Sequence, residues 1–393
     1  MKRSLKIAVL SDLHCHPSTI NPPNTVLFSD GLRLPSKEHP VENLIDLIEE
    51  DKLIADILMC PGDFAHQANR QGLLSGWTFV NEIAKAFGNT PIISTIGNHD
   101  VDSRNNQNSY SFNDVKKIGK NFPIKSQYLD SFWSNGFSLI EEEDYIVLVI
   151  NSCHFHTHNI GNVIQHGQLD SNQLEQIEKI LQEFKDDDRI KILLLHHHPV
   201  QHERFELGED DFLKNGENLM QIISNSNFDV VIHGHKHDPW LRYHIPKSGD
   251  KKIPVMSSGS FSATNQKLYA EIGNYFHIIE IMKDNSGSKG KVTSYNYKNR
   301  GGWNKDKGDF YHHSGFGNTL SLQEIVDLVK AKVTKEKNLI PLKDLANDIE
   351  QLDYLTPDEM TKLKEKLELV NIVMPNLGMQ KKANNMVFFY DTE

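Results

Sequence analysis

The chain has 393 residues and a formal net charge of −11, and 38% of its residues are hydrophobic and 24% charged. This length and composition are typical of a soluble globular protein with one large domain and an appendage, or with two domains. No run approaches the ~18 consecutive apolar residues of a membrane-spanning helix. The acidic balance argues against broad nucleic-acid binding, and a local basic groove stays open as an alternative.

The N-terminus and the cysteines indicate a cytoplasmic protein. Residues 1–4 lead directly into an apolar run, without the hydrophobic stretch and cleavage pattern of a secretory leader. Cys15, Cys60 and Cys153 are too few for a disulfide framework in a chain of this length, which suits a reducing compartment. None of the three stands in a Cys-x-x-Cys pair, so a structural zinc site is not expected.

The first hundred residues alternate short apolar runs with amphipathic helical patterns. Strands are predicted over residues 6–10, 56–60 and 91–96, and helices over 42–52 and 77–87. Continuous β-branched and apolar runs of this length suit strands that are buried on both faces. The repeated order of strand, loop and helix is therefore typical of an α/β domain built in layers.

A second series of elements follows a polar, irregular segment over residues 101–135. Two strands over residues 137–141 and 145–151 are close enough in sequence to pair antiparallel. Further along, alternating helices and strands are predicted over residues 172–184, 190–195, 217–224 and 229–232, followed by strand-like stretches to residue 297. We therefore expect one α/β domain over residues 1–297.

The character of the chain changes after residue 297. Residues 298–318 are rich in glycine, lysine and aromatic side chains and are predicted to be a linker or loop, and residues 319–393 to be a helical C-terminal module. Ser321 and Thr356 each begin a helical pattern with a glutamate three positions later, as in a capping box. Amphipathic helices must cover their apolar faces on one another, on the preceding domain or on a partner chain. Self-association or partner docking is our hypothesis, and packing within the chain is the alternative.

Side chains that can bind a metal follow the strands of the α/β series. They are Asp12 and His14, then Asp63, then Asn98 and His99, then His196, then His235 and His237. Because ligands gather at the carboxyl ends of strands in such sheets, we expect these side chains to lie together. Carboxylate, amide and imidazole donors suit Mn²⁺, Fe²⁺/³⁺ or Zn²⁺. They are too many for one ion and suit two ions ~3.5–4 Å apart, with Asp63 as the predicted bridge.

Five short motifs of the chain resemble those of the calcineurin-like metallophosphoesterase superfamily. In chain order they are Asp12-x-His14, Gly62-Asp63, Gly97-Asn98-His99-Asp100, His196-x-x-Pro199 and Gly234-His235-x-His237. The resemblance implies a four-layer α-β-β-α sandwich with a dinuclear metal site. It also implies the ligands of each ion, which are Asp12, His14, Asp63 and His237 for the first and Asp63, Asn98, His196 and His235 for the second.

Two further features concern the branch of the superfamily. Residues 167–174 (GQLDSNQL) and the block His196-His197-His198-Pro199 are similar to segments of the bacterial class III cyclic-nucleotide and glycerol phosphodiesterases. The segment NSCHFHTHN departs from that branch and places His154, His156 and His158 in alternation. We expect these three histidines on one face of an exposed strand or loop, with the rim of a substrate pocket as the alternative.

Several neighbours of the metal-binding residues have expected roles beside them. His99 is not needed as a ligand and is expected to face the substrate, where it protonates the leaving oxygen or holds a phosphate oxygen. Asp100 either orients His99 or caps the following turn. His197 and His198 either support the ligands or pack in the core.

We therefore predict a dinuclear phosphohydrolase with two divalent ions (Mn, Fe or Zn). The predicted reaction is the cleavage of a small or nucleotide-like phosphodiester by in-line attack of a metal-bridging hydroxide, with His99 and Asp63 as catalytic residues. A nuclease is one alternative and would need a basic, aromatic groove, for which Trp303, Phe310 and Tyr311 are the candidates. A phosphomonoesterase is a second possibility and a non-catalytic partner-binding scaffold a third, and no membrane partner is expected.

Overall fold

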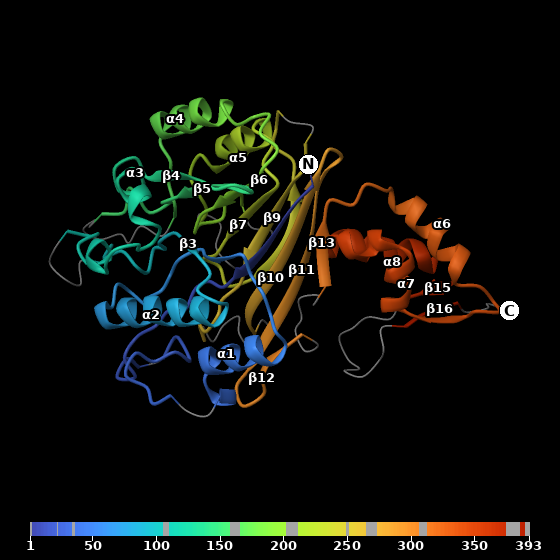
Figure 1. The fold of residues 1–393 in the computed structure, drawn as a ribbon, viewed down its shortest axis with the longest axis horizontal. Coiled ribbons are helices and arrows are strands. Elements are labelled where there is room, and N and C mark those ends of the chain that lie inside the picture. Colours follow the sequence, from blue (N-terminus) through green and yellow to red (C-terminus); the bar gives the residue numbers. More distant parts are fainter. Residues whose placement is uncertain are drawn as a thin grey trace.

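The structure, a computed structural model, contains two stacked β-sheets between two layers of helices, with a smaller C-terminal part beside them (Figure 1). Short 3₁₀ turns at Ser36–Glu38, Val115–Lys117 and Ser126–Tyr128, and the helix α3 (Leu129–Ser134), lie in the connections. The residues that the structure describes are 2–21, 23–33, 36–104, 110–157, 166–201, 211–248, 251–264, 273–305, 313–374 and 386–389.

The first sheet contains the N-terminal strands. β1 (Arg3–Val9), β2 (Ile57–Cys60) and β3 (Ile92–Ser94) run parallel, close to the predicted apolar runs. Beyond β1 the sheet continues antiparallel in the order β10 (Asn274–Asp284), β11 (Gly287–Lys298) and β12 (Gly302–Asn304). β13 (His313–Phe316) also pairs with β11. The parallel strands therefore end at one edge of this sheet.

The second sheet has the order β4-β5-β6-β7-β9-β8. β4 (Phe137–Glu141) and β5 (Tyr145–Ile150) form the predicted antiparallel pair. The parallel strands of this sheet are β5, β6 (Ile190–Leu194), β7 (Val230–His233) and β9 (Ile253–Ser258). β8 (Pro239–His244) closes the sheet antiparallel to β9.

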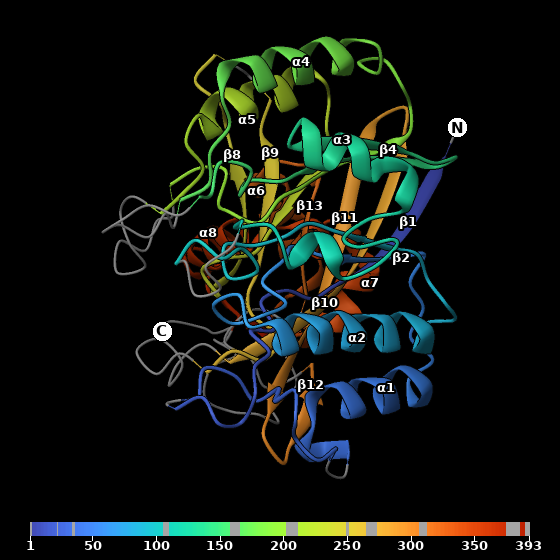
Figure 2. The ribbon, with the colours of Figure 1, turned by 90° about the vertical axis from the view of Figure 1, so that its left-hand side faces the viewer.

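Helices cover the outer face of each sheet. α1 (Pro40–Glu50) and α2 (Arg70–Ala86) bury their apolar residues with the first sheet, and α4 (Ser171–Gln182) and α5 (Gly216–Asn225) with the second. Figure 2 shows the two helix pairs on opposite sides of the sheets. The expected four-layer α-β-β-α architecture is therefore confirmed. Among the described helices, none is long and apolar enough to cross a membrane, and the cytoplasmic location stays a prediction.

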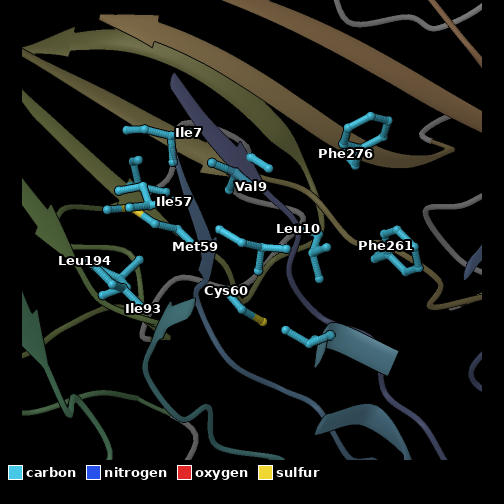
Figure 3. Close-up of a cluster of buried hydrophobic side chains, with 14 of the residues drawn as sticks. Ile7, Val9, Leu10, Ile57, Met59, Cys60, Ile93, Leu194, Phe261 and Phe276 are labelled. Atoms are coloured by element: carbon cyan, nitrogen blue, oxygen red, sulfur yellow. The ribbon is translucent and has the colours of Figure 1, made fainter. Parts of the chain in front are cut away.

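The side chains of the second sheet alternate between two cores. In β5, Val147 and Val149 belong to the large core shared with the first sheet, while Leu148 and Ile150 pack in the core that includes α4 and α5. A period of two is expected of a strand that is buried on both faces. Figure 3 shows the core between the sheets, in which Leu194 of β6 lies among side chains of β1, β2 and β3. This core fixes the strand ends of one sheet relative to those of the other.

The segment 298–318 departs from the expected linker or loop. Two of its parts are the strands β12 and β13, and residues 306–312 lie outside the described part of the chain. Trp303 is 6% exposed and its ring centroid lies 5.0 Å from that of Phe261 and 5.2 Å from that of Tyr297. The local composition is typical of loops, but pairing with β11 makes these residues form strands.

The C-terminal part contains the three expected helices and, in addition, a small sheet. α6 (Leu322–Lys332), α7 (Leu342–Asp348), the 3₁₀ turn η5 (Glu350–Tyr354) and α8 (Pro357–Glu368) follow the expected pattern, with both capping boxes present. A purely helical module is nevertheless wrong, because β14 (Leu339–Pro341), β15 (Ile372–Val373) and β16 (Met386–Phe389) form a sheet in the order β14-β16-β15. Strands of this length are too short for an alternating pattern to be recognised in the sequence.

This C-terminal part packs on the two-sheet body (Figure 1). The backbone N–H of Gly315 in β13 donates to the carbonyl oxygen of Leu355 at 2.8 Å. Lys252 forms an ion pair with Glu359 of α8 at 3.2 Å. The apolar residues of the helices pack with one another in a core of their own. Packing within the chain therefore covers most of the apolar faces that the sequence predicts.

Candidate metal centre

The seven side chains expected to bind metal lie together where the parallel strands end. They are Asp12 and His14 after β1, Asp63 after β2, Asn98 after β3, His196 after β6, and His235 and His237 after β7. Parallel strands bring their carboxyl ends to the same edge of a sheet. The first sheet therefore supplies both carboxylates, the amide and one imidazole, and the second sheet supplies three imidazoles.

Five of these seven residues have a left-handed backbone conformation. The φ angle is 54° at Asp12, 48° at His14, 56° at Asp63, 85° at His235 and 59° at His237. Residues other than glycine rarely adopt positive φ, and such strain costs about 1–3 kcal/mol per residue and concentrates at functional sites. The surrounding core therefore holds the chain in conformations that bring these donors together.

Four donors form a first cluster. Nε2 of His14 and Nε2 of His237 lie 2.9 Å apart. Oδ1 of Asp12 lies 3.3 Å from Nε2 of His237 and 3.7 Å from Nε2 of His14. Oδ2 of Asp63 lies 3.5 Å from Nε2 of His14. The first cluster thus contains the four residues that the family resemblance implies for the first ion.

A second cluster shares Asp63 with the first. Oδ2 of Asp63 also lies 3.4 Å from Nε2 of His196. Oδ1 of Asn98 lies 3.1 Å from Nε2 of His196 and 3.0 Å from Nδ1 of His235, and these two ring nitrogens are 3.2 Å apart. One carboxylate oxygen therefore faces both clusters.

The donor atoms in both clusters are spaced as the ligands of one ion are. Ligands that lie about 2.0–2.2 Å from a metal are roughly 3.0–3.5 Å from one another. The distances between neighbouring donors here run from 2.9 Å to 3.7 Å. His14 and His237 also direct a ring nitrogen at each other, an arrangement that a cation between them stabilises. The residues present therefore fit two metal ions.

Buried carboxylates make this region favourable for positive charge. Asp12 and Asp63 are both buried. Burial alone would raise the pKa of Asp12, but His14 and His237 hold that pKa well below its usual range. Burial likewise disfavours a charged His196, yet the neighbouring Asp63 raises the pKa of this imidazole to about 9. A buried cluster of carboxylates of this kind attracts cations.

Two glycines allow the ligand loops to approach the carboxylates. A Cβ atom at Gly97 would lie 2.1 Å from Oδ1 of Asp63, and one at Gly234 would lie 2.5 Å from Oδ2 of Asp12. Both distances are shorter than van der Waals contact, so any side chain would displace a carboxylate. The glycines before Asn98 and His235 are therefore required by the site as well as suited to a turn.

Asp100 ties the ligand loops of β2 and β3 together. Its carboxylate accepts the backbone N–H groups of Asp63, Ala65 and Gly97, each at 2.9 Å. These bonds satisfy donors in the turns after β2 and β3, which precede Asp100 in the chain, whereas the sequence predicts a cap on the following turn or a role in orienting His99. The bonds fix the backbone around Asp63 and Asn98 relative to each other.

His99 borders the first cluster. Its backbone N–H donates to Oδ1 of Asp63 at 2.8 Å, and its Nδ1 accepts the N–H of Gln67 at 3.2 Å. The ring lies edge-on to that of His14, with 4.6 Å between centroids. Burial lowers the pKa of His99 well below its usual range. The ring is thus neutral and lies beside the metal-binding residues.

Two residues near the clusters were not identified from the sequence. Oδ1 of Asp211 lies 3.2 Å from Nε2 of His235, and the same carboxylate forms an ion pair with Lys236. His66 stacks on His99, with 5.1 Å between ring centroids. Asp211 lies in the connection before α5 and has no motif around it. For His66, its position three residues after Asp63 was an available signal.

The expectation for the histidines at 154–158 is wrong for His156. This residue is 2% exposed, with Nδ1 3.2 Å from Oγ of Ser103 and Nε2 3.0 Å from the carbonyl oxygen of His166. Residues 152–155 form a turn, so the two-residue period of a strand does not apply. His154 is partly exposed, and His158 lies outside the described residues.

His197 and His198 are both buried behind the second cluster. The ring of His197 lies 4.5 Å from that of His235, and its Nδ1 is 2.7 Å from Oγ of Ser152. The ring of His198 lies 4.4 Å from that of His233. His197 therefore lies beside the candidate ligand His235, whereas His198 packs next to the end of β7.

Comparisons with protein families agree with this geometry. The family model of the calcineurin-like phosphoesterases matches residues 5–239. A second model, wHTH-Calcineurin_assc, which describes a calcineurin-associated winged helix-turn-helix domain, matches residues 314–369. No match was found among curated proteins.

Solved structures that resemble this chain include phosphatases. A dimetal phosphatase from Danio rerio has 12% identity and a TM-score of 0.43, over 75% of this chain and 99% of that chain. A purple acid phosphatase from yellow lupin has 14% identity and a TM-score of 0.49, over 79% of this chain and 53% of that chain. Vps29 from Chaetomium thermophilum has 11% identity and a TM-score of 0.30, over 74% and 90% of the two chains. Because the phosphoesterase model matches more than half of its length, the chain belongs to the calcineurin-like phosphoesterase family.

Proposed function

We propose that this protein is a phosphohydrolase that uses two divalent ions to cleave a small or nucleotide-like phosphodiester. The position of Asp63 carries the proposal, because its Oδ2 lies 3.5 Å from His14 in one cluster and 3.4 Å from His196 in the other. A carboxylate shared by two sets of donors suits a pair of ions that act together at phosphorus. The similarity of residues 167–174 and 196–199 to bacterial class III phosphodiesterases supports a diester as the substrate.

The seven residues divide into two sets of ligands that share one carboxylate. Asp12, His14, Asp63 and His237 would hold one ion, and Asp63, Asn98, His196 and His235 the other. When bound, two such ions polarise a water molecule and the phosphoryl oxygens. Mn²⁺, Fe²⁺/³⁺ and Zn²⁺ all suit this mixture of oxygen and nitrogen donors. Oδ1, the second oxygen of Asp63, accepts a hydrogen bond from the backbone N–H of His99 at 2.8 Å. This bond fixes the orientation of the carboxylate.

His99 would hold a phosphoryl oxygen. Because its Nδ1 accepts the N–H of Gln67 at 3.2 Å, the neutral ring carries its proton on Nε2. A neutral imidazole is a good hydrogen-bond donor and a weak acid. Of the two roles expected for His99, the geometry therefore supports holding a phosphate oxygen over protonating the leaving oxygen.

The nuclease alternative gains no support from the aromatic candidates. Trp303 is 6% exposed, and its Nε1 donates to the carbonyl oxygen of Pro40 at 2.8 Å, so its ring is not free to stack on a base. Phe310 and Tyr311 lie outside the described residues. The exposed charged residues of α8, which lies in the part matched by the winged helix-turn-helix model, are Lys362, Glu365, Lys366 and Glu368, and their charges balance.

Two further alternatives are a non-catalytic scaffold and a phosphomonoesterase, and the geometry favours the second over the first. A non-catalytic scaffold is less well supported, because all seven donors are present and close together. A phosphomonoesterase would use the same centre and differs in substrate. For residues 319–393, self-association or partner docking stays a prediction, and the contacts of Leu355 and α8 with the two-sheet body support packing within the chain.

The substrate class can be tested with the purified chain and Mn²⁺. The proposal expects bis-p-nitrophenyl phosphate to be hydrolysed faster than p-nitrophenyl phosphate, with cyclic nucleotides and single-stranded DNA as further substrates. A chelator should abolish hydrolysis and added Mn²⁺ should restore it. Faster hydrolysis of the monoester would assign the enzyme to phosphomonoesters. Absence of hydrolysis of every ester by protein that holds two ions per chain would contradict the proposed function.

A further inference from the structure

A pair of histidine rings beside the first cluster is not accounted for by metal binding. The rings of His66 and His99 stack at 5.1 Å between centroids, with an interplanar angle of 30°. Both also contact the ring of His14, at 5.8 Å and 4.6 Å between centroids. The three rings each have one nitrogen in a common group, and the three nitrogens of this group all lie within 4.8 Å of one another. His66 and His99 therefore add ring nitrogens at the border of the metal centre.

Asn24 determines which nitrogen of His66 carries the proton. Nδ2 of Asn24 lies 3.1 Å from Nε2 of His66. An amide nitrogen can only donate, so Nε2 accepts and the proton of the neutral ring is on Nδ1. Asn24 is itself held in place, because its backbone N–H donates to Nε2 of His16 at 3.2 Å, and Nδ1 of His16 bonds the carbonyl oxygen of Pro17 at 2.8 Å.

The N–H group of His66 has no acceptor in the described part of the protein. His66 is 7% exposed, and its buried Nδ1 has no hydrogen-bond partner among the described residues. Buried donors without a partner are rare in folded proteins and indicate a bound water, an ion or a functional role. Since Nδ1 carries a proton, the missing partner is an acceptor and not a metal ion.

His99 presents a second fixed donor next to the first. Its Nδ1 accepts the N–H of Gln67 at 3.2 Å, which leaves the proton on Nε2. Two fixed N–H donors on adjacent rings suit an anion.

We propose that Nδ1–H of His66 and Nε2–H of His99 together hold one anionic oxygen of the substrate's phosphoryl group beside the first cluster. The identity of the ligand rests on the proposed function, and His66 is thereby named as a substrate-binding residue. Asn24 is a positioning residue, because it acts through the ring of His66. The stacked rings keep the two donors at a fixed separation, so they are oriented before the substrate arrives.

The test compares two variants of His66 in the full chain loaded with Mn²⁺. The amide nitrogen of asparagine can occupy the place of Nδ1, whereas that of glutamine occupies the place of Nε2. His66→Asn therefore keeps a donor toward the ligand, and His66→Gln keeps only the group that faces Asn24. The measurements are the manganese content of each protein and its affinity for inorganic phosphate by calorimetry.

The proposal expects two manganese ions per chain in the unmodified protein, in His66→Asn and in His66→Gln. His66→Gln should weaken phosphate binding by roughly 10- to 100-fold, as for the loss of one hydrogen bond to a charged group, and His66→Asn by much less. Asn24→Ala, which leaves the ring in place, should weaken phosphate binding several-fold and provides a second route if the His66 variants do not fold. Wild-type phosphate affinity in His66→Gln would overturn the proposal, and so would the loss of a manganese ion from it.

The result of this test can be distinguished from the result of the test of the proposed function. Phosphate binding that depends on His66, in a protein that hydrolyses no ester, would contradict the proposed reaction and leave the anion site intact. Hydrolysis of a diester by protein whose phosphate affinity does not depend on His66 would do the reverse.

Discussion

Oδ1 of Asp211 lies 3.2 Å from Nε2 of His235, on the opposite side of the ring from Nδ1, which belongs to the second cluster. A carboxylate behind a metal-binding imidazole fixes the tautomer and the orientation of the ring. Lys236 pairs with the same carboxylate, so the connection before α5 is joined to the loop that carries His235. Asp211 is therefore placed to act on the second cluster through His235.

Removing this carboxylate should weaken the second metal ion. Asp211→Ala should lower the affinity for one of two Mn²⁺ ions by ~10–100-fold and leave the other unchanged. Asp211→Asn keeps an acceptor oxygen and should recover part of the loss. Stepwise Mn²⁺ titration by calorimetry measures both affinities, with Glu50→Ala, on the exposed end of α1, as a control for the loss of one negative charge. Equal affinities in Asp211→Ala and the unmodified chain would contradict this role.

Asp63 should be required for both ions, because its Oδ2 faces both clusters. Asp63→Asn removes a negative charge that the two ions would share, so both should bind more weakly and turnover should collapse. Metal analysis of the purified variant gives the number of ions per chain, and an assay with the diester gives turnover. Two ions per chain with near-normal turnover would refute the dinuclear assignment.

His99 should affect good and poor leaving groups alike. If Nε2–H holds a phosphoryl oxygen, His99→Ala loses one hydrogen bond to a charged group, which corresponds to roughly 10- to 100-fold in kcat/KM. The loss should be similar for a nitrophenyl diester and for an alkyl or ribose diester. A loss in the range of 10²–10⁴-fold that is confined to the poor leaving groups would instead identify His99 as a general acid.

Gly97 should tolerate no side chain. In Gly97→Ala the new Cβ would lie 2.1 Å from Oδ1 of Asp63, so the carboxylate must move and metal content should fall. Gly301→Ala is a matched control, because Gly301 lies in the turn between β11 and β12 and its nearest neighbour is Cβ of Lys298 at 3.2 Å. The measurement is the number of manganese ions per folded chain. Full occupancy in Gly97→Ala would mean that the backbone around Asp63 is more adaptable than these contacts imply.

The C-terminal part should be separable from the chemistry. A chain that ends at Gly317 keeps all seven metal-binding residues and loses the bond from Gly315 to Leu355, so it should retain turnover and unfold at a lower temperature. If residues 319–393 also assemble the protein, as we predict, light scattering will show fewer chains per particle after truncation. The same number of chains per particle in both proteins, with no partner lost, would contradict the assembly role. Loss of turnover in a folded truncated chain would mean that the C-terminal part contributes to the pocket.

Much of the sheet order and the gathering of the candidate metal-binding residues could be predicted because both depend on local patterns. Asp63 lies in the turn after a buried strand, and the other donors also lie shortly after strands. Because the carboxyl ends of parallel strands meet at one edge of a sheet, the donors come together. The strand at residues 302–304 could not be predicted in this way, because its pairing partner β11 is chosen by the fold. Trp303 illustrates the difference: its aromatic neighbours suggested a surface, and the sheet buries it.

The contacts around the metal centre depend on tertiary structure and were therefore harder to infer. His66 gains its position from stacking on His99, and Asp211 from a connection whose path the sequence does not reveal. His156 shows the opposite error: the alternating pattern predicts one exposed face of a strand or loop, whereas the chain forms a turn there and buries this residue. Sequence patterns thus identify donors that follow strands, while the residues that orient those donors become visible only in the folded chain.

Ligands drawn from both sheets have a consequence for the lifetime of the protein. Asp63 belongs to the first sheet and His196 to the second, so an ion between them ties together two halves that the core alone would otherwise join. Anything that binds the folded chain and not the unfolded one shifts the balance toward the folded form. Under the proposed function, metal supply would govern two properties at once, the rate of hydrolysis and the survival of each copy against unfolding and proteolysis.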